Sequence, residues 1–312
     1  MVSYRLTDDE LTYLDQVAKE YIKTPSAWNT WCPARTIPLV REVEWKVMTN
    51  MRGPKGSLDG TMTTRAATTY TTSTAKILHL AYDLHWSDLE VETARRTGSS
   101  IQTDEMALAN MYMDQAIERF IISGSMSWET PDVSGLLASA TDVGGYTALD
   151  AVFWDTPAGG PSAHAKAMYG AMNALGLRPP YTWVLGENLR KGIADLNAST
   201  SDRSSRELIK DLYEVDRIIF VPIAAAAATE LDTTIKPFPV AAGDDSRWFA
   251  FPSTNTSTYF ELQQINGGKR FIFNPEIDMK TKTYYGRLEW AGTMRITHPT
   301  AVVDEDQVDL VA

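Results

Sequence analysis

Three polar residues on one predicted strand are the residues best placed for chemistry. His79, Asp83 and His85 alternate with the apolar residues of the 78–86 segment, so they share one face of that strand. Imidazole and carboxylate groups in such an arrangement can bind a metal ion or exchange protons with a substrate. The same alternation is typical of a strand with one solvated face, and this second interpretation is favoured.

The motifs that mark common active sites do not occur in the sequence. It has no glycine-rich phosphate loop, no zinc-binding H-E-x-x-H and no nucleophile elbow. Its single cysteine, Cys32, rules out an intrachain disulfide and is best interpreted as a small, half-buried residue. The acidic residues Asp304, Glu305 and Asp306 are interpreted as solvated tail charges. We therefore expect no enzyme activity, no metal and no cofactor.

The charge of the chain argues against a nucleic-acid-binding surface. The 312 residues include 29 basic and 40 acidic side chains, which give a net charge of −11. Binding to a phosphate backbone depends on clustered basic residues, which this balance disfavours. No run of residues approaches the roughly 18 apolar residues of a membrane span, and the N-terminal residues do not resemble a signal peptide. We expect a soluble protein.

A long connection between two predicted strands is the most informative feature of the chain. Strands are predicted at 43–47 and 78–86, and the 48–75 connection is far longer than the usual hairpin loop of about 2 to 5 residues. It is rich in Gly and Thr and poor in large apolar side chains, so it should project and contact another chain. The expected interface residues in it are Arg52, Gly53, Lys55, Gly56, Asp59 and Gly60.

A proline-rich arm precedes the first strand, and a long helix follows the second. The arm carries Trp28 and Trp31, which we expect to pack on a surface, with a neighbouring subunit as the expected partner. The helix is predicted over 103–123, with Gly124 as its stop. Its apolar stripe includes Met106, Met113, Ile117 and Phe120. A helix of this length, about 30 Å, can form the backbone of a domain.

The remaining pattern predicts an α+β protein without regular βαβ alternation. Helices are predicted at 161–176, 187–196 and 202–212, and strands at 181–185, 217–222, 247–251, 258–263, 271–274 and 283–297. Gly286 and Gly292 lie inside the last strand, where they suggest bends or bulges.

The order of these elements resembles that of the major capsid proteins of tailed bacteriophages and of the related encapsulin shell proteins. The resemblance lies in VREVEWKV, the long excursion, LHLAYDLHWSDL, and a helix that ends with Ala116, Glu118, Phe120, Ile121 and Gly124. DRIIFVP, FIFNPEI and the closing LEWAGTMRITHPTAVV continue it.

The resemblance implies the tailed-phage capsid fold, divided into five parts. These are an N-terminal helix and arm (1–40), an extended-loop hairpin (41–95), a peripheral domain with a spine helix (96–180), an axial domain (181–255), and a return to the peripheral domain with a C-terminal tail (256–312).

The resemblance also implies a function. The chain would be a structural subunit that assembles with itself, as pentamers and hexamers, into an icosahedral shell around double-stranded DNA, without sequence-specific binding. Scaffold, portal and decoration proteins would be its partners, and the virion, assembled in the host cytoplasm, its location. Two alternatives remain open, an encapsulin-like compartment that houses a cargo enzyme, and a soluble hydrolase or binding protein that uses the His79, Asp83 and His85 face.

Overall fold

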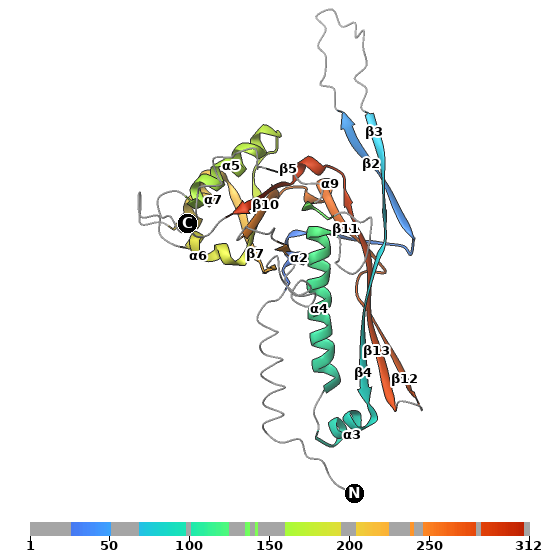
Figure 1. The fold of residues 1–312 in the computed structure, drawn as a ribbon. Coiled ribbons are helices and arrows are strands. Elements are labelled where there is room, and N and C mark those ends of the chain that lie inside the picture. The colour runs from blue at the N-terminus through green and yellow to red at the C-terminus, as the bar shows by residue number, and fades with distance from the viewer. Residues whose placement is uncertain are drawn as a thin grey trace, which may run out of the picture.

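The computed structural model describes residues 26–50, 69–97, 101–124, 135–137, 141–142, 160–194, 204–224, 238–239, 246–278 and 282–308. These residues form two five-stranded sheets, a long helix that covers one of them, and a two-stranded ribbon that extends from the body (Figure 1). The α+β class predicted from the sequence is confirmed.

The first sheet is built around one long strand near the end of the chain. Its members are β1 (Ala34–Ile37), β4 (Leu78–Ser87), β11 (Phe260–Ile265), β12 (Arg270–Asp278) and β13 (Thr283–Ile296). β13 pairs antiparallel with β4, β11 and β12, and β1 adds to β11 in parallel. β4 shows the predicted alternation, since its side chains are buried and exposed in turn. The partner of β4 is therefore a strand from the other end of the chain.

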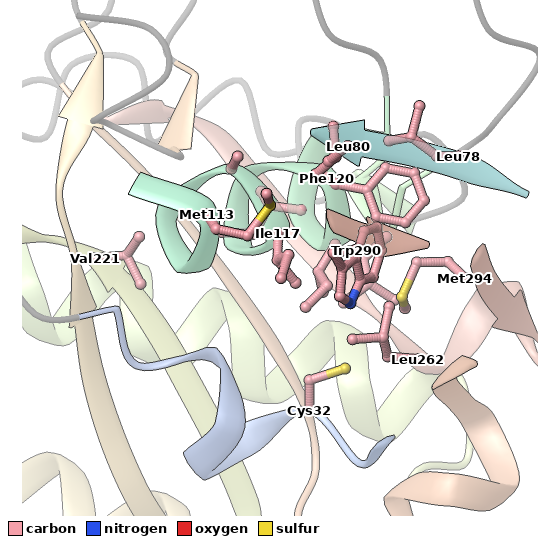
Figure 2. Packing of buried hydrophobic residues seen from close by; sticks show 14 of the residues in the cluster. Cys32, Leu78, Leu80, Met113, Ile117, Phe120, Val221, Leu262, Trp290 and Met294 are labelled. Carbon is pink, nitrogen blue, oxygen red and sulfur yellow. The ribbon is translucent and has the colours of Figure 1, made fainter. Parts of the chain in front are cut away.

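The long helix α4 (Ile101–Ser123) packs on the buried face of this sheet, as Figure 1 shows. The predicted helix is confirmed, and Gly124, with φ +78°, ends it in the left-handed conformation that glycine favours. Ile117 and Phe120 are fully buried, and the Phe120 ring meets Trp290 of β13 edge-on with centroids 5.7 Å apart. Figure 2 shows these side chains in one cluster with those of the sheet.

The second sheet has the order β5-β14-β10-β6-β7. Its strands are β5 (Thr141–Asp142), β6 (Tyr181–Gly186), β7 (Val215–Val221), β10 (Ser246–Pro252) and β14 (Val303–Val308). Phe249 and Phe251 of β10 join the α4 cluster, whereas Trp248 and Ala250 belong to a second cluster on the opposite face. The sheet is therefore buried on both faces. This explains why the sequence of β6 is mostly apolar and does not alternate with polar residues.

Helices cover the second face of this sheet. They are α5 (Gly160–Ala174), the 3-10 turn η2 (Glu187–Leu189), α6 (Arg190–Ala194) and α7 (Ser205–Tyr213). α7 begins with a capping box, in which Ser204 accepts a hydrogen bond from the Glu207 amide and the Glu207 carboxylate accepts one from the Ser204 amide.

Two strands form a ribbon apart from both sheets. β2 (Glu42–Asn50) pairs antiparallel with β3 (Thr69–Lys76), and α3 (Asp88–Thr97) follows β4. The sequence analysis assigns no strand to the 48–75 connection, whereas the structure has one there. The end of that connection forms β3, the direct partner of β2, whereas β4 turns away to pair with β13.

Short elements complete the described chain. They are α2 (Trp28–Trp31), the parallel pair β8 (Ile223–Ala224) and β9 (Phe238–Pro239), α9 (Thr256–Tyr259) and the 3-10 turn η3 (Pro299–Ala301). Of the described helices, none combines the length and apolar character needed to cross a membrane.

Of the bends or bulges expected at Gly286 and Gly292, the bulges do not occur. The pairing of β13 with β4 runs without a register shift from Thr283 to Gly292. A Cβ atom at Gly286 would lie 2.8 Å from two ring carbons of Trp86, and one at Gly292 would lie 2.6 Å from Cζ2 of Trp290. The two glycines therefore make room for buried indole rings.

The acidic residues near the C-terminal end do not all lie in solvent. Asp304 and Glu305 are 3% and 2% exposed because they lie in β14, inside the second sheet. Arg247 of β10 donates from Nε to both carboxylate oxygens of Asp304 at 3.0 and 3.1 Å, and its Nη2 also contacts Oδ2. The prediction of solvated tail charges is wrong for these two residues, because strand pairing covers them.

Candidate assembly surface

One tryptophan of the ribbon is buried against the body. Trp45 of β2 is 9% exposed, and its Nε1 donates to the carbonyl oxygen of Ile296 at 2.8 Å. Of the other side chains of β2 and β3 whose exposure the structure describes, none is buried, and Tyr70 is 57% exposed. A two-stranded ribbon on its own is only marginally stable in water. The exposed part of this ribbon therefore offers surface to another molecule.

The predicted interface residues of the excursion lie outside the described residues. Arg52, Gly53, Lys55, Gly56, Asp59 and Gly60 all fall between the end of β2 and the start of β3. β2 ends and β3 begins on either side of this segment. The two strands form the ribbon that extends from the first sheet (Figure 1). The role of these six residues in a subunit interface stays a prediction.

The two arm tryptophans pack on their own chain. Trp31 is 5% exposed, and its ring lies 5.7 Å from Phe249 and 6.1 Å from Phe251, both in β10. Trp28 packs against the same cluster, and its Nε1 lies 3.4 Å from Oδ1 of Asp114 in α4. The expectation that a neighbouring subunit covers these rings does not hold for Trp31, because the space between the two sheets is already its site.

The four predicted core residues of the spine helix lie where the stripe places them. Met113, Ile117 and Phe120 are at most 3% exposed, and Met106 packs against the same cluster from a partly buried position. Met113, Ile117 and Phe120 come from successive turns of α4 and hold it on the first sheet (Figure 2).

The polar face of β4 is solvated. His79, Asp83 and His85 are exposed, as the favoured interpretation expects. Arg287 of β13 forms an ion pair with Asp83 through Nε at 2.6 Å and Nη2 at 3.1 Å, and this hydrogen-bonded guanidinium lowers the pKa of the carboxyl group. His85 instead meets the ring of Tyr285 edge-on, with centroids 5.0 Å apart.

A shallow hollow lies next to this face. It has a volume of about 350 Å³ and includes His79, Arg270, Arg287, Glu289 and the exposed Leu39 in its lining. Among the residues that the structure describes, no three histidine, cysteine or acidic side chains come together as a metal site would require. The geometry there is that of an ordinary surface depression beside an ion pair.

Two carboxylates on α4 face the arm, and the sequence alone does not predict this. Asp114 and Glu118 fall off the apolar stripe, yet Glu118 is 1% exposed. Ser26 Oγ donates to its Oε2 at 3.0 Å and the Ala27 amide donates to its Oε1 at 3.2 Å. The only signal in the sequence is the helix periodicity, which places both acids one turn apart on the face that the arm covers.

Comparison with known proteins identifies the architecture. No family model matches the chain, and no curated protein matches it by sequence. Among solved structures, the capsid of Myoviridae phage XM1 matches with a TM-score of 0.57 at 14% identity, over 99% of this chain and 95% of that one. A chain of Mycobacterium phage Ogopogo matches with a TM-score of 0.62 at 11% identity, over 91% and 92%.

A third solved structure extends the comparison beyond phages. A virus-like particle from Pyrococcus furiosus matches with a TM-score of 0.56 at 11% identity, over 94% of this chain and 98% of that one. In all three cases the match extends over nearly the whole of both chains. The chain therefore has the fold of the major capsid proteins of tailed bacteriophages, which the virus-like particle shares.

Proposed function

We propose that this chain is the major capsid protein of a tailed double-stranded DNA bacteriophage, and that it assembles with itself into a closed icosahedral shell of pentamers and hexamers. The observation that carries this proposal is the ribbon. It extends from the body, to which Trp45 is hydrogen-bonded, and most of the side chains described on its two strands are not buried within a single copy. Shell subunits gain part of their stability from such contacts between copies.

The charge of the chain fits a container for DNA. A net charge of −11 gives a wall that does not retain phosphate backbones, so a genome could be packed and released without sequence-specific contacts. On this proposal the protein is found in the virion after assembly in the host cytoplasm. Scaffold, portal and decoration proteins would be its other partners.

An encapsulin-like compartment is the second candidate, and the likeness to the virus-like particle from Pyrococcus furiosus favours it. The two candidates share the shell and differ in its contents. Particles purified from the native source should contain nuclease-protected DNA if the chain is a capsid protein. If an enzyme co-purifies and no DNA is protected, the chain forms an encapsulin-like compartment and not a capsid.

The shell itself is tested with purified full-length protein. Light scattering after size-exclusion chromatography and negative-stain electron microscopy should show closed particles of uniform size. A variant with residues 52–68 replaced by a short Gly-Ser turn should keep its circular dichroism spectrum and lose the particles, if the segment acts between copies and not within one. The matched control is Asp83→Asn, which changes an exposed ion pair and should leave assembly intact. A stable monomer at high concentration for the unmodified chain would refute both shell candidates.

A further inference from the structure

The arm segment 26–37 contacts both five-stranded sheets. β1 pairs with β11 of the first sheet, and the Leu262 amide donates to the Pro33 carbonyl at 2.8 Å. On the other side, Trp31 packs on β10 of the second sheet, and Arg217 of β7 donates to the Thr30 carbonyl at 2.9 Å. The segment therefore bridges the two sheets next to α4.

Two carboxylates of α4 hold the start of this bridge. Glu118 accepts from Ser26 Oγ and from the Ala27 amide, and Asp114 accepts from Trp28 Nε1. Asp114 also accepts from Lys269 at 2.7 Å, whereas Ser26 and Ala27, which donate to Glu118, are uncharged. We refer to Asp114 and Glu118 with residues 26–28 as the clamp.

The burial of Glu118 makes the clamp sensitive to protons. Loss of hydration raises the pKa of Glu118 to about 7, although the donor groups of Ser26, Ala27 and Trp31 act in the opposite direction. The negative charge of Asp114, one turn away, adds to the increase. When the arm leaves, water reaches this carboxyl group, and its pKa returns toward the ordinary value of 4.5.

Both protonation states satisfy the hydrogen bonds of the clamp. With the carboxylate, Ser26 and the Ala27 amide both donate. In the protonated acid, the new O–H group donates to Ser26 Oγ, which is also an acceptor, while the other oxygen still accepts from the Ala27 amide. Proton uptake therefore removes the buried charge without breaking the contact.

We propose that the clamp is a proton-linked joint, which holds the arm between the two sheets more tightly as the pH falls through neutrality and releases it more readily as the pH rises. The inference goes beyond the proposed function, because it concerns a single copy of the chain and does not depend on what the shell encloses.

The charged groups around Glu118 do not offset this effect. On α4 they are Asp114 and Arg119, which is 9% exposed, and Lys269 forms an ion pair with Asp114. On the first sheet, Glu261 of β11 is already paired with Arg295 of β13 at 2.8 Å. β4 faces α4 with four uncharged side chains (Leu78, Leu80, Leu84 and Trp86) and with Tyr82, which stacks on Tyr112. From β7, Arg217 reaches the Thr30 carbonyl, and the described residues of β9, Phe238 and Pro239, are uncharged.

The sign and size of the effect follow from linkage. A carboxyl group whose pKa is higher in the docked state favours docking fully below its undocked pKa of 4.5, and this contribution is lost as the pH rises through about 7. With these two pKa values, the equilibrium constant for docking of the arm should fall about tenfold between pH 6 and pH 8.5.

Hydrogen exchange of the Ala27 amide measures this equilibrium directly, since that amide donates to Glu118. The experiment uses the full chain at one assembly state, verified by size-exclusion chromatography, with exchange rates corrected for intrinsic pH dependence. In the unmodified protein, protection of this amide should fall about tenfold from pH 6 to pH 8.5. Equal protection at the two pH values would overturn the proposal.

Three variants isolate Glu118 as the responsible group. Glu118→Gln keeps an acceptor for Ala27 and a polar partner for Ser26 without a titrating proton, so protection should become independent of pH. Asp114→Asn removes the neighbouring charge and should move the midpoint to lower pH. Glu92→Gln, in an exposed ion pair of α3, makes the same change of net charge and should behave like the unmodified chain. An undiminished pH dependence in Glu118→Gln would assign the effect to another group and refute the proposal.

Discussion

The indole N–H of Trp45 donates to the backbone carbonyl of Ile296, a residue 251 positions further along the chain, and this bond ties the ribbon to the end of β13. Both residues are at most 9% exposed. A buried carbonyl that loses its donor bears the full cost of its desolvation, whereas the aromatic packing is a separate contribution.

Trp45→Phe separates these two contributions. The phenyl ring keeps most of the packing but cannot donate, so the free energy of unfolding should fall by about 1–3 kcal/mol. Denaturant unfolding measures this loss, and hydrogen exchange of β2 and β3 should rise in the same variant. Tyr70→Phe on the exposed part of the ribbon is the control and should change neither quantity. A Trp45→Phe protein as stable as the unmodified chain would show that the hydrogen bond does not hold the ribbon.

The Arg247–Asp304 pair should be far more important for stability than the Arg287–Asp83 pair. The side chains of the first pair are 18% and 5% exposed, and those of the second are 51% and 48% exposed. Asp304→Asn leaves a largely buried guanidinium without its counter-charge and should cost about 3–5 kcal/mol. Asp83→Asn should leave the free energy of unfolding nearly unchanged, because solvent screens that pair. Equal losses in urea unfolding would contradict this ranking.

Gly286 should not tolerate a side chain. Alanine there would bring Cβ within 2.8 Å of the Trp86 ring, and the packed core can relieve that overlap only by shifting, at about 1–3 kcal/mol. Gly170 in α5 is the matched control, since a Cβ atom there would have no neighbour within 4 Å. Gly170→Ala should raise the free energy of unfolding by about 0.5–1 kcal/mol through helix propensity, and the melting temperature should rise with it. Calorimetry on both variants should show a lower melting temperature for Gly286→Ala and a higher one for Gly170→Ala.

Phe120 should be the most costly truncation on the spine helix. It is fully buried and packs edge-on against Trp290, so Phe120→Ala should lose about 3–5 kcal/mol through the cavity that it leaves. Leu212→Ala, at a side chain that is 63% exposed, should stay within about 0.5 kcal/mol of the unmodified chain. Thermal unfolding gives both values, and a mild Phe120→Ala phenotype would mean that the cluster collapses around the gap.

Cys32 should report on the release of the arm. It is 4% exposed, and burial raises the pKa of its thiol, so the native protein should react very slowly with a thiol reagent at pH 8. In denaturant the same thiol should react at the rate of a free cysteine. Fast labelling of the native chain would show that the 26–37 bridge opens readily. Labelling that is faster in Glu118→Ala than in the unmodified chain would connect this opening to the clamp.

Local patterns are sufficient to predict most of the helices and strands but not their partners. The alternation in 78–86 and the stripe of α4 predict one buried face each, and both are observed. β3 is not predicted, because its sequence, TYTTSTAK, has no apolar alternation and pairs through its backbone with β2. Strand pairing depends on segments far apart in the chain, so periodicity within one segment carries no information about it.

The sequence also does not predict which polar groups are buried, for a related reason. Glu118 belongs to the polar face of an amphipathic helix and Asp304 to an acidic stretch, so composition marks both as solvated. Each is buried because a distant segment covers it, the arm in one case and β10 in the other. The chemistry of the clamp therefore exists only in the folded chain.

The pairing of β4 with β13 has a consequence for the timing of synthesis. Asp83 and its partner Arg287 are 204 residues apart, so β4 leaves the ribosome long before the strand that completes its sheet. Contacts of such long range form slowly. The first sheet therefore cannot be completed on a nascent chain until β13 has been synthesised.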